Sequence, residues 1–94
     1  MASSKYGLEC LQEAMRNAFY ERDSNRGLYA TFTWLIEEVG ELAEALLSND
    51  KSKIEEEIAD VIAWTLSIAN LVGVDALTAF KKKYHVELSS VDCM

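Results

Sequence analysis

The sequence predicts an all-α protein on three observations. The 94 residues include no proline and only four glycines, so few positions interrupt a helix. Apolar residues recur every three or four positions over long stretches, as they do along one face of a helix. No window shows the strict apolar–polar alternation of a half-buried strand. A chain of this length forms one domain, residues 1–94, for which we expect a core at about 8–84 and an irregular tail at 86–94.

The first helix is expected to follow Ser4 and to end near Arg22. Its apolar face consists of Leu8, Leu11, Met15, Ala18 and Phe19. The polar segment 23–27 is typical of a turn, because its short side chains bond to their own backbone. A second helix is expected from about Thr31 to Leu47. Its apolar stripe consists of Phe32, Leu35, Ile36, Val39, Leu42, Ala43 and Leu46.

The third helix is expected to start at a capping box formed by Ser52 and Glu55, after a turn at 48–50. It runs to about Val72, and Gly73 suits the left-handed position just past its end. Asp75 can cap a short fourth helix that ends near Tyr84.

The third helix is apolar almost all round beyond Asp60. The residues concerned are Val61, Ile62, Ala63, Trp64, Leu66, Ile68, Ala69, Leu71 and Val72. Such a helix must be covered on more than one side, and a 94-residue chain has too few elements to enclose it. We therefore expect a homodimer through this face.

Charge and targeting signals limit the partners. Residues 37–60 contain nine acids and two bases, so this segment carries the whole net charge of −7. A nucleic-acid polymer is excluded as a general partner, because phosphate contacts need a surplus of Lys and Arg. The longest charge-free run, 61–74, is too short to span a bilayer, and the first residues lack a signal-peptide pattern. Cys10 and Cys93 have no paired spacing, so we expect a reducing, cytoplasmic setting.

Carboxylates cluster on the second and third helices. Glu38 and Glu41 lie about 60° apart on one helix face, Glu37 is near them, and Glu57 and Asp60 repeat the three-residue spacing. A short turn makes the two helices antiparallel neighbours, so Glu38, Glu41, Glu57 and Asp60 would converge. From spacing alone, an ordinary solvated acidic stripe stays open and is the commoner arrangement, because acidic faces on helices are frequent.

Converging carboxylates repel one another unless a cation lies between them. An all-oxygen ligand set selects magnesium, manganese or calcium over zinc or copper. Magnesium usually takes one or two carboxylates, waters and the phosphates of a substrate. The expected site is therefore a metal cluster of one of these hard cations, Mg²⁺, Mn²⁺ or Ca²⁺, for a phosphorylated ligand.

The acidic motifs resemble those of a known enzyme family. Glu37-Glu38-Val39-Gly40-Glu41, then fifteen residues, then Glu57-Ile58-Ala59-Asp60 is similar to the E-E-x-x-E and E-x-x-D pair of the MazG-like all-α nucleoside triphosphate pyrophosphohydrolases. The likeness covers about residues 8–84 and extends to the segments 31–35, 60–64, 70–75 and 83–84.

This resemblance implies an antiparallel four-helix bundle that forms dimers, in some members tetramers. It implies magnesium-dependent cleavage of an NTP or dNTP to the monophosphate and pyrophosphate by a metal-activated water, in the housekeeping of nucleotide pools. The implied metal ligands are Glu38, Glu41, Glu57 and Asp60. Glu37 would bind a second metal or orient the water, which makes Glu37, Glu38 and Glu41 the implied catalytic residues.

Other residues are candidates for binding the nucleotide. Trp34 lies on the carboxylate face, where it could stack on a base or pack at the bundle end. Lys83 and Tyr84, in the basic run 81–83 and just after it, could bind the outgoing phosphates, or the lysines could complement a helix C-terminus. Arg26 is a further phosphate candidate. Ser67 stands where larger MazG enzymes carry Asn, a departure for which Asn70 could compensate.

Two other functions stay open at this point. One is phosphoribosyl-ATP pyrophosphohydrolase activity, which a related all-α family with similar acidic motifs carries out. The other is a helical interaction module that binds metal or nucleotide without turnover.

Overall fold

The structure, a computed structural model, describes residues 7–84, and these form four helices and no strand. The predicted all-α class is thus confirmed. The helices are α1 (Leu8–Arg26), α2 (Leu28–Ser48), α3 (Lys51–Val72) and α4 (Ala76–Tyr84). The predicted tail at 86–94 lies outside the described residues. No single helix between residues 7 and 84 meets the length and apolarity that a membrane span requires; only α3 and α4 taken together do, across a bend of 100°.

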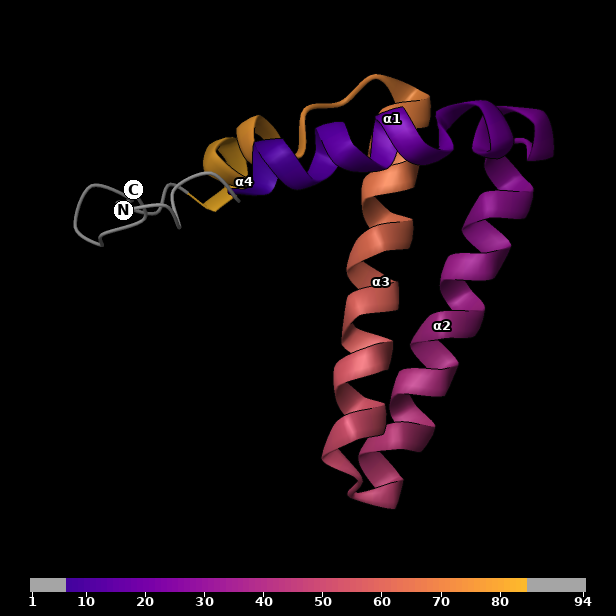
Figure 1. Cartoon of the computed structure of the whole chain (residues 1–94). Helices are drawn as coiled ribbons and strands as arrows, with labels where there is room; N and C mark the ends of the chain where they lie inside the picture. Colours follow the sequence, from indigo (N-terminus) through magenta and orange to yellow (C-terminus); the bar gives the residue numbers. More distant parts are fainter. Residues whose placement is uncertain (1–6, 85–94) are drawn as a thin grey trace.

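The long hairpin of α2 and α3 is the main feature of the fold (Figure 1). Its two helices run antiparallel and pack against each other, lying closest near the turn that joins them and diverging toward the other end. The other two helices contact each other and lie across one end of the hairpin, near the end of α3. Gly73, with φ 74°, ends α3 in the left-handed position as predicted, and the short link after it turns the chain by 100° into α4. Among residues 7–84, therefore, α2 and α3 form the longest antiparallel pair.

The first connection differs from the sequence prediction. The expected turn at 23–27 is wrong, because α1 continues through Arg26 and α2 starts at Leu28 instead of near Thr31. Asp23 does not cap a turn: its side chain is only 2% exposed and accepts a hydrogen bond from Arg26 at the helical i,i+3 spacing. The corner consists of Gly27 alone, whose φ of 99° is one that L side chains rarely adopt.

The third helix, α3, also begins earlier than the sequence predicted. The capping box of Ser52 and Glu55 is wrong by two residues, because α3 begins at Lys51 with Asp50 as its cap. The Asp50 carboxylate accepts hydrogen bonds from the backbone N–H of Ser52 and, more weakly, of Lys53. Asn49 takes the left-handed conformation just before it. The predicted cap of α4 is confirmed, since Asp75 accepts hydrogen bonds from the N–H and hydroxyl of Thr78.

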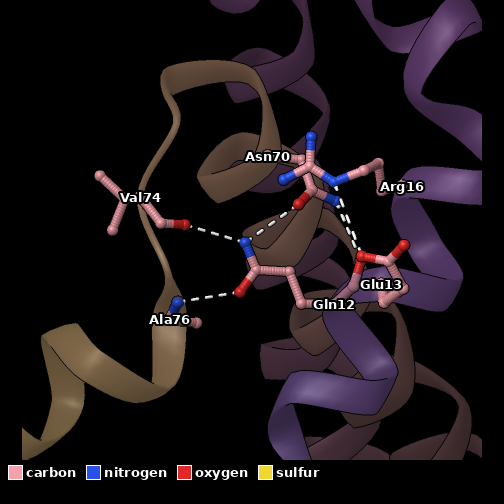
Figure 2. A network of polar contacts seen from close by, with 6 residues as sticks. All are labelled: Gln12, Glu13, Arg16, Asn70, Val74 and Ala76. Carbon is pink, nitrogen blue, oxygen red and sulfur yellow. Dashed lines mark hydrogen bonds and ion pairs between the residues drawn. The ribbon is translucent and has the colours of Figure 1, made fainter.

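A polar network joins α1 to the C-terminal end of α3 and to the start of α4 (Figure 2). The side-chain amide of Gln12 donates to Asn70 Oδ1 at 3.0 Å and to the carbonyl of Val74 at 2.8 Å. Its Oε1 accepts from the N–H of Ala76 at 2.8 Å, and Asn70 donates back to the carbonyl of Gln12. Both side chains are buried. Asn70 therefore holds together the corner formed by α1, α3 and α4. Because its side chain is bound to Gln12, it does not compensate for the Ser67 departure, and Ser67 is itself buried.

This network yields the first prediction. Gln12→Ala leaves the buried Asn70 oxygen and the N–H of Ala76 without their partner, so we expect a loss of about 2 kcal/mol in the free energy of unfolding. For a domain of this size, that loss lowers the Tm by roughly 10 °C. The neighbouring Glu13→Ala is the control, because its ion pair with Arg16 is 3.9 Å long and exposed. Equal thermal unfolding of the two variants would contradict the prediction.

Candidate metal centre

Three carboxylates meet halfway along the α2–α3 hairpin. Glu38 and Glu41 stand one turn apart on α2, and Glu57 faces them from α3. Each offers one carboxylate oxygen, and these oxygens all lie within 4.8 Å of one another. The antiparallel pairing of the helices brings them together, as their spacing in the sequence predicted.

Two oxygens of this cluster are buried without a partner. Oε1 of Glu38 and Oε1 of Glu57 have no hydrogen-bond donor among the described residues, although both atoms are shielded from solvent. Glu41 is exposed. Every ion pair within residues 7–84 lies on α1, so no Lys or Arg there neutralises the cluster. Buried carboxylate oxygens with no donor are costly unless a proton or a cation satisfies them.

Burial and the nearby negative charges both raise the pKa of Glu38. Burial raises its pKa to about 7, with further contributions from a hydrogen bond to Glu57 and from the charges of Asp60, Glu41 and Glu57. That hydrogen bond exists only when one of the two carboxyls is protonated; while both are ionised, Oε1 of each has no donor among the described residues. The pKa of Glu41 is also raised, first by the charge of Glu57, then by desolvation and by Glu37 and other neighbours. In the metal-free protein, protons thus take part of the role that a cation would have.

Asp60 and Glu37 stand beside the three-carboxylate cluster. Asp60 is not one of the three residues whose oxygens share the 4.8 Å limit. Its charge nevertheless raises the pKa of both Glu38 and Glu41, so it lies close to them. Glu37 is exposed, and its charge acts on Glu41.

The donor set fits a hard divalent cation. It consists only of carboxylate oxygens, two of them buried and unsatisfied, and it contains no thiol or imidazole. These residues could hold a magnesium or manganese ion, and a cation there would relieve the repulsion that raises the pKa of Glu38.

A pair of tryptophans lies one helical turn from the carboxylates. The rings of Trp34 and Trp64 stack with centroids 6.1 Å apart and planes inclined by 13°. Trp34 was a candidate from the sequence, but Trp64 was assigned to the apolar face. The signal that could have found it is position: Trp34 comes four residues before Glu38 and Trp64 four residues after Asp60, and in antiparallel helices these positions meet.

Lys83 and Tyr84 do not join the carboxylates within one chain. They line a separate apolar groove between α3 and α4, together with Val61, Ile62 and Phe80. Tyr84 also packs on the ring of Phe80, at 5.0 Å between centroids. Their contact with phosphate stays a prediction, in which a second copy of the chain would supply them.

A comparison with models of protein families shows which family the chain belongs to. The model of the MazG nucleotide pyrophosphohydrolase domain matches residues 26–85, more than half of the chain. The chain belongs to the MazG family. The MazG match starts at the last residue of α1 and includes the whole α2–α3 hairpin with its carboxylates. A search of curated proteins finds no match.

Membership in the MazG family bears out the resemblance that the two acidic motifs carry. It indicates a nucleotide pyrophosphohydrolase, a class of metal-dependent enzyme, and the carboxylate cluster lies within the matched segment.

Proposed function

We propose that this MazG protein is a magnesium-dependent nucleoside triphosphate pyrophosphohydrolase. It cleaves an NTP or dNTP of the cytoplasmic pool to the monophosphate and pyrophosphate, as a housekeeping activity. The observation that carries this proposal is the cluster of Glu38, Glu41 and Glu57, with two buried oxygens that have no donor among the described residues.

Glu38, Glu41, Glu57 and Asp60 would hold the metal, which is Mg²⁺ with Mn²⁺ as a substitute. Held by these carboxylates, the ion would supply positive charge to neutralise the phosphates and would make a bound water more acidic. Hydrolysis joins the water oxygen to the α-phosphorus and breaks the bond from that phosphorus to the bridging oxygen, which leaves with pyrophosphate. We assign Glu37 to orient this water and to accept its proton, because Glu37 is exposed beside Glu41.

The rest of the nucleotide would extend along the hairpin. Trp34 is 47% exposed and lies one turn from Glu38, which suits it to stack on the base while the phosphates reach the carboxylates. Trp64 completes this aromatic surface. Lys83 and Tyr84 of a second copy would bind the outgoing phosphates.

The purified protein tests this function directly. We expect pyrophosphate release when it is incubated with Mg²⁺ and a panel of canonical and modified triphosphates. Phosphoribosyl-ATP belongs in the panel, because preference for it would favour the histidine-pathway activity over general nucleotide hydrolysis. Unchanged nucleotide throughout a broad panel would contradict the proposal and favour a binding module.

We also propose that the chain forms a homo-oligomer, either a dimer or a tetramer built from two dimers, through the apolar surface of α3. Among residues 7–84, Ala45 and Leu66 are the only buried apolar side chains. Ile58 and Ile62, one turn apart on α3, are both nearly half exposed. So small a core is marginal for a domain of this length, and a second copy would cover these side chains.

Ile62→Glu tests the dimer. A charge at this position would have to be buried in the interface without a partner, so we expect a monomer and a lower Tm. Ser52→Glu is the matched control, since it adds the same charge to the exposed first turn of the same helix. The masses of both variants in analytical ultracentrifugation decide the question, and a dimer of Ile62→Glu as tight as that of the wild type would exclude this face.

A further inference from the structure

The last turn of α1 carries a buried ion pair beside the tryptophan pair. Asp23 is 2% exposed, and its Oδ1 accepts a hydrogen bond from Arg26 Nη1 at 3.0 Å. The same Nη1 lies 3.4 Å from Oγ1 of Thr31, which is fully buried. Arg22 also approaches Asp23, but only at 3.7 Å from an exposed position. A buried carboxylate needs its charge partner, so Asp23 fixes Arg26 in place.

The guanidinium held in this way contacts Trp64. Its central carbon lies 5.0 Å from the centre of the Trp64 ring, within the range of a cation–π interaction. Trp64 in turn stacks on Trp34. A continuous chain of contacts thus runs from a buried charge on α1, through Arg26 and Trp64, to the exposed ring of Trp34 on α2.

We propose that Arg26, held by Asp23, is a positioning residue that orients the Trp34–Trp64 pair for stacking on the base of the nucleotide. This inference rests on the proposed function. The inference replaces the expectation that Arg26 binds phosphate. Nη1 of Arg26 is hydrogen-bonded to Asp23 and Thr31, and the guanidinium group lies over the ring of Trp64. It also gives α1 a role in the site, although Asp23 precedes the segment matched by the family.

The chain provides a direct spectroscopic readout, because Trp34 and Trp64 are its only two tryptophans. Arg26→Met removes the cation over Trp64, and Arg26→Lys keeps a charge for Asp23 but loses the planar group. We expect both variants to change the tryptophan bands of the near-UV circular dichroism. Should Arg26→Met fail to fold, Arg26→Lys alone decides. Arg16→Met is the matched control, since Arg16 also lies over an aromatic ring, Tyr20, and pairs with an acid at i,i+3, but at an exposed place outside the site.

Kinetics test whether this orientation serves base binding. We expect the Arg26 variants to raise the KM for the best nucleoside triphosphate by about fivefold, with kcat within about twofold of the wild type. Inhibition by tripolyphosphate, which has no base, should stay unchanged. Equal weakening of tripolyphosphate would make Arg26 a phosphate ligand and overturn the inference.

The outcomes separate the inference from the function on which it rests. Hydrolysis by the wild type with an unaltered KM and unaltered tryptophan bands in the Arg26 variants overturns the inference and leaves the function standing. If the wild type hydrolyses no triphosphate, the proposed function fails. In that event, tryptophan quenching by added nucleotide that the Arg26 variants weaken supports the inference, and its absence overturns it.

Discussion

Glu41→Gln is expected to lower pyrophosphate release by about a thousandfold while leaving the fold intact. Glu41 is the exposed member of the cluster, so an amide of the same shape costs little in packing. It removes a negative charge and a metal-binding oxygen at the point where Glu38, Glu41 and Glu57 meet. Turnover is measured with the best triphosphate of the panel at saturating Mg²⁺.

The same variant has a thermodynamic signature that does not depend on turnover. A cation that binds only the folded state stabilises it by about 2.7 kcal/mol at a concentration 100 times its Kd. For a domain of this size, Mg²⁺ should therefore raise the wild-type Tm by roughly 10 °C, and Glu41→Gln should lose most of this rise. Glu55→Gln is the matched control, because Glu55 is an exposed acid on α3 outside the three-carboxylate cluster, and its charge is not among those that raise the pKa of Glu38 or Glu41. An equal rise in Glu41→Gln and in the wild type would refute the metal assignment.

The sequence was sufficient to predict the helices and the meeting of Glu38, Glu41 and Glu57. Helical periodicity marks which residues share a face, and a short turn forces neighbouring helices to run antiparallel. Both are local rules, so they needed no knowledge of the tertiary structure. The third helix likewise ends at Gly73, and the fourth helix begins just after Asp75, as predicted.

The sequence predictions were wrong or incomplete where contacts between distant parts of the chain determine the structure. Asp has a low intrinsic helix propensity, yet the burial of Asp23 and its pair with Arg26 keep α1 helical through this residue. The direction of α1 across the hairpin depends on Gln12 and Asn70, which are 58 residues apart in the chain. The contact of Trp64 with Trp34 was not predicted, because Trp64 has apolar neighbours in the sequence. A sequence alone does not show which side of an apolar helix lies next to an acidic site.

The stability of the metal-free protein is expected to fall as the pH rises from about 5 to about 8. Glu38 has a folded-state pKa of about 7 against a usual value of 4.5, so the folded state holds a proton that the unfolded chain releases. Its contribution to stability is full below pH 4.5 and is lost as the pH rises through 7. Glu41 shifts in the same direction. We expect the Tm without divalent ions to drop by about 5 °C over this range, as thermal unfolding in a chelator would show.

Glu38→Gln separates this effect from other titrations. An amide can donate to Glu57 at every pH, so the drop in Tm between pH 5 and 8 should shrink in this variant. The single histidine, His85, is present in both proteins, so the comparison cancels any contribution from it, and Asp75, whose pKa is lowered, acts only at more acidic pH. Mg²⁺ binds the ionised carboxylates, so its stabilisation of the wild type must grow from pH 5 to 8. A Tm that rises with pH in the metal-free wild type, or a drop that Glu38→Gln leaves intact, would show that Glu38 does not hold a proton in the folded protein near neutral pH.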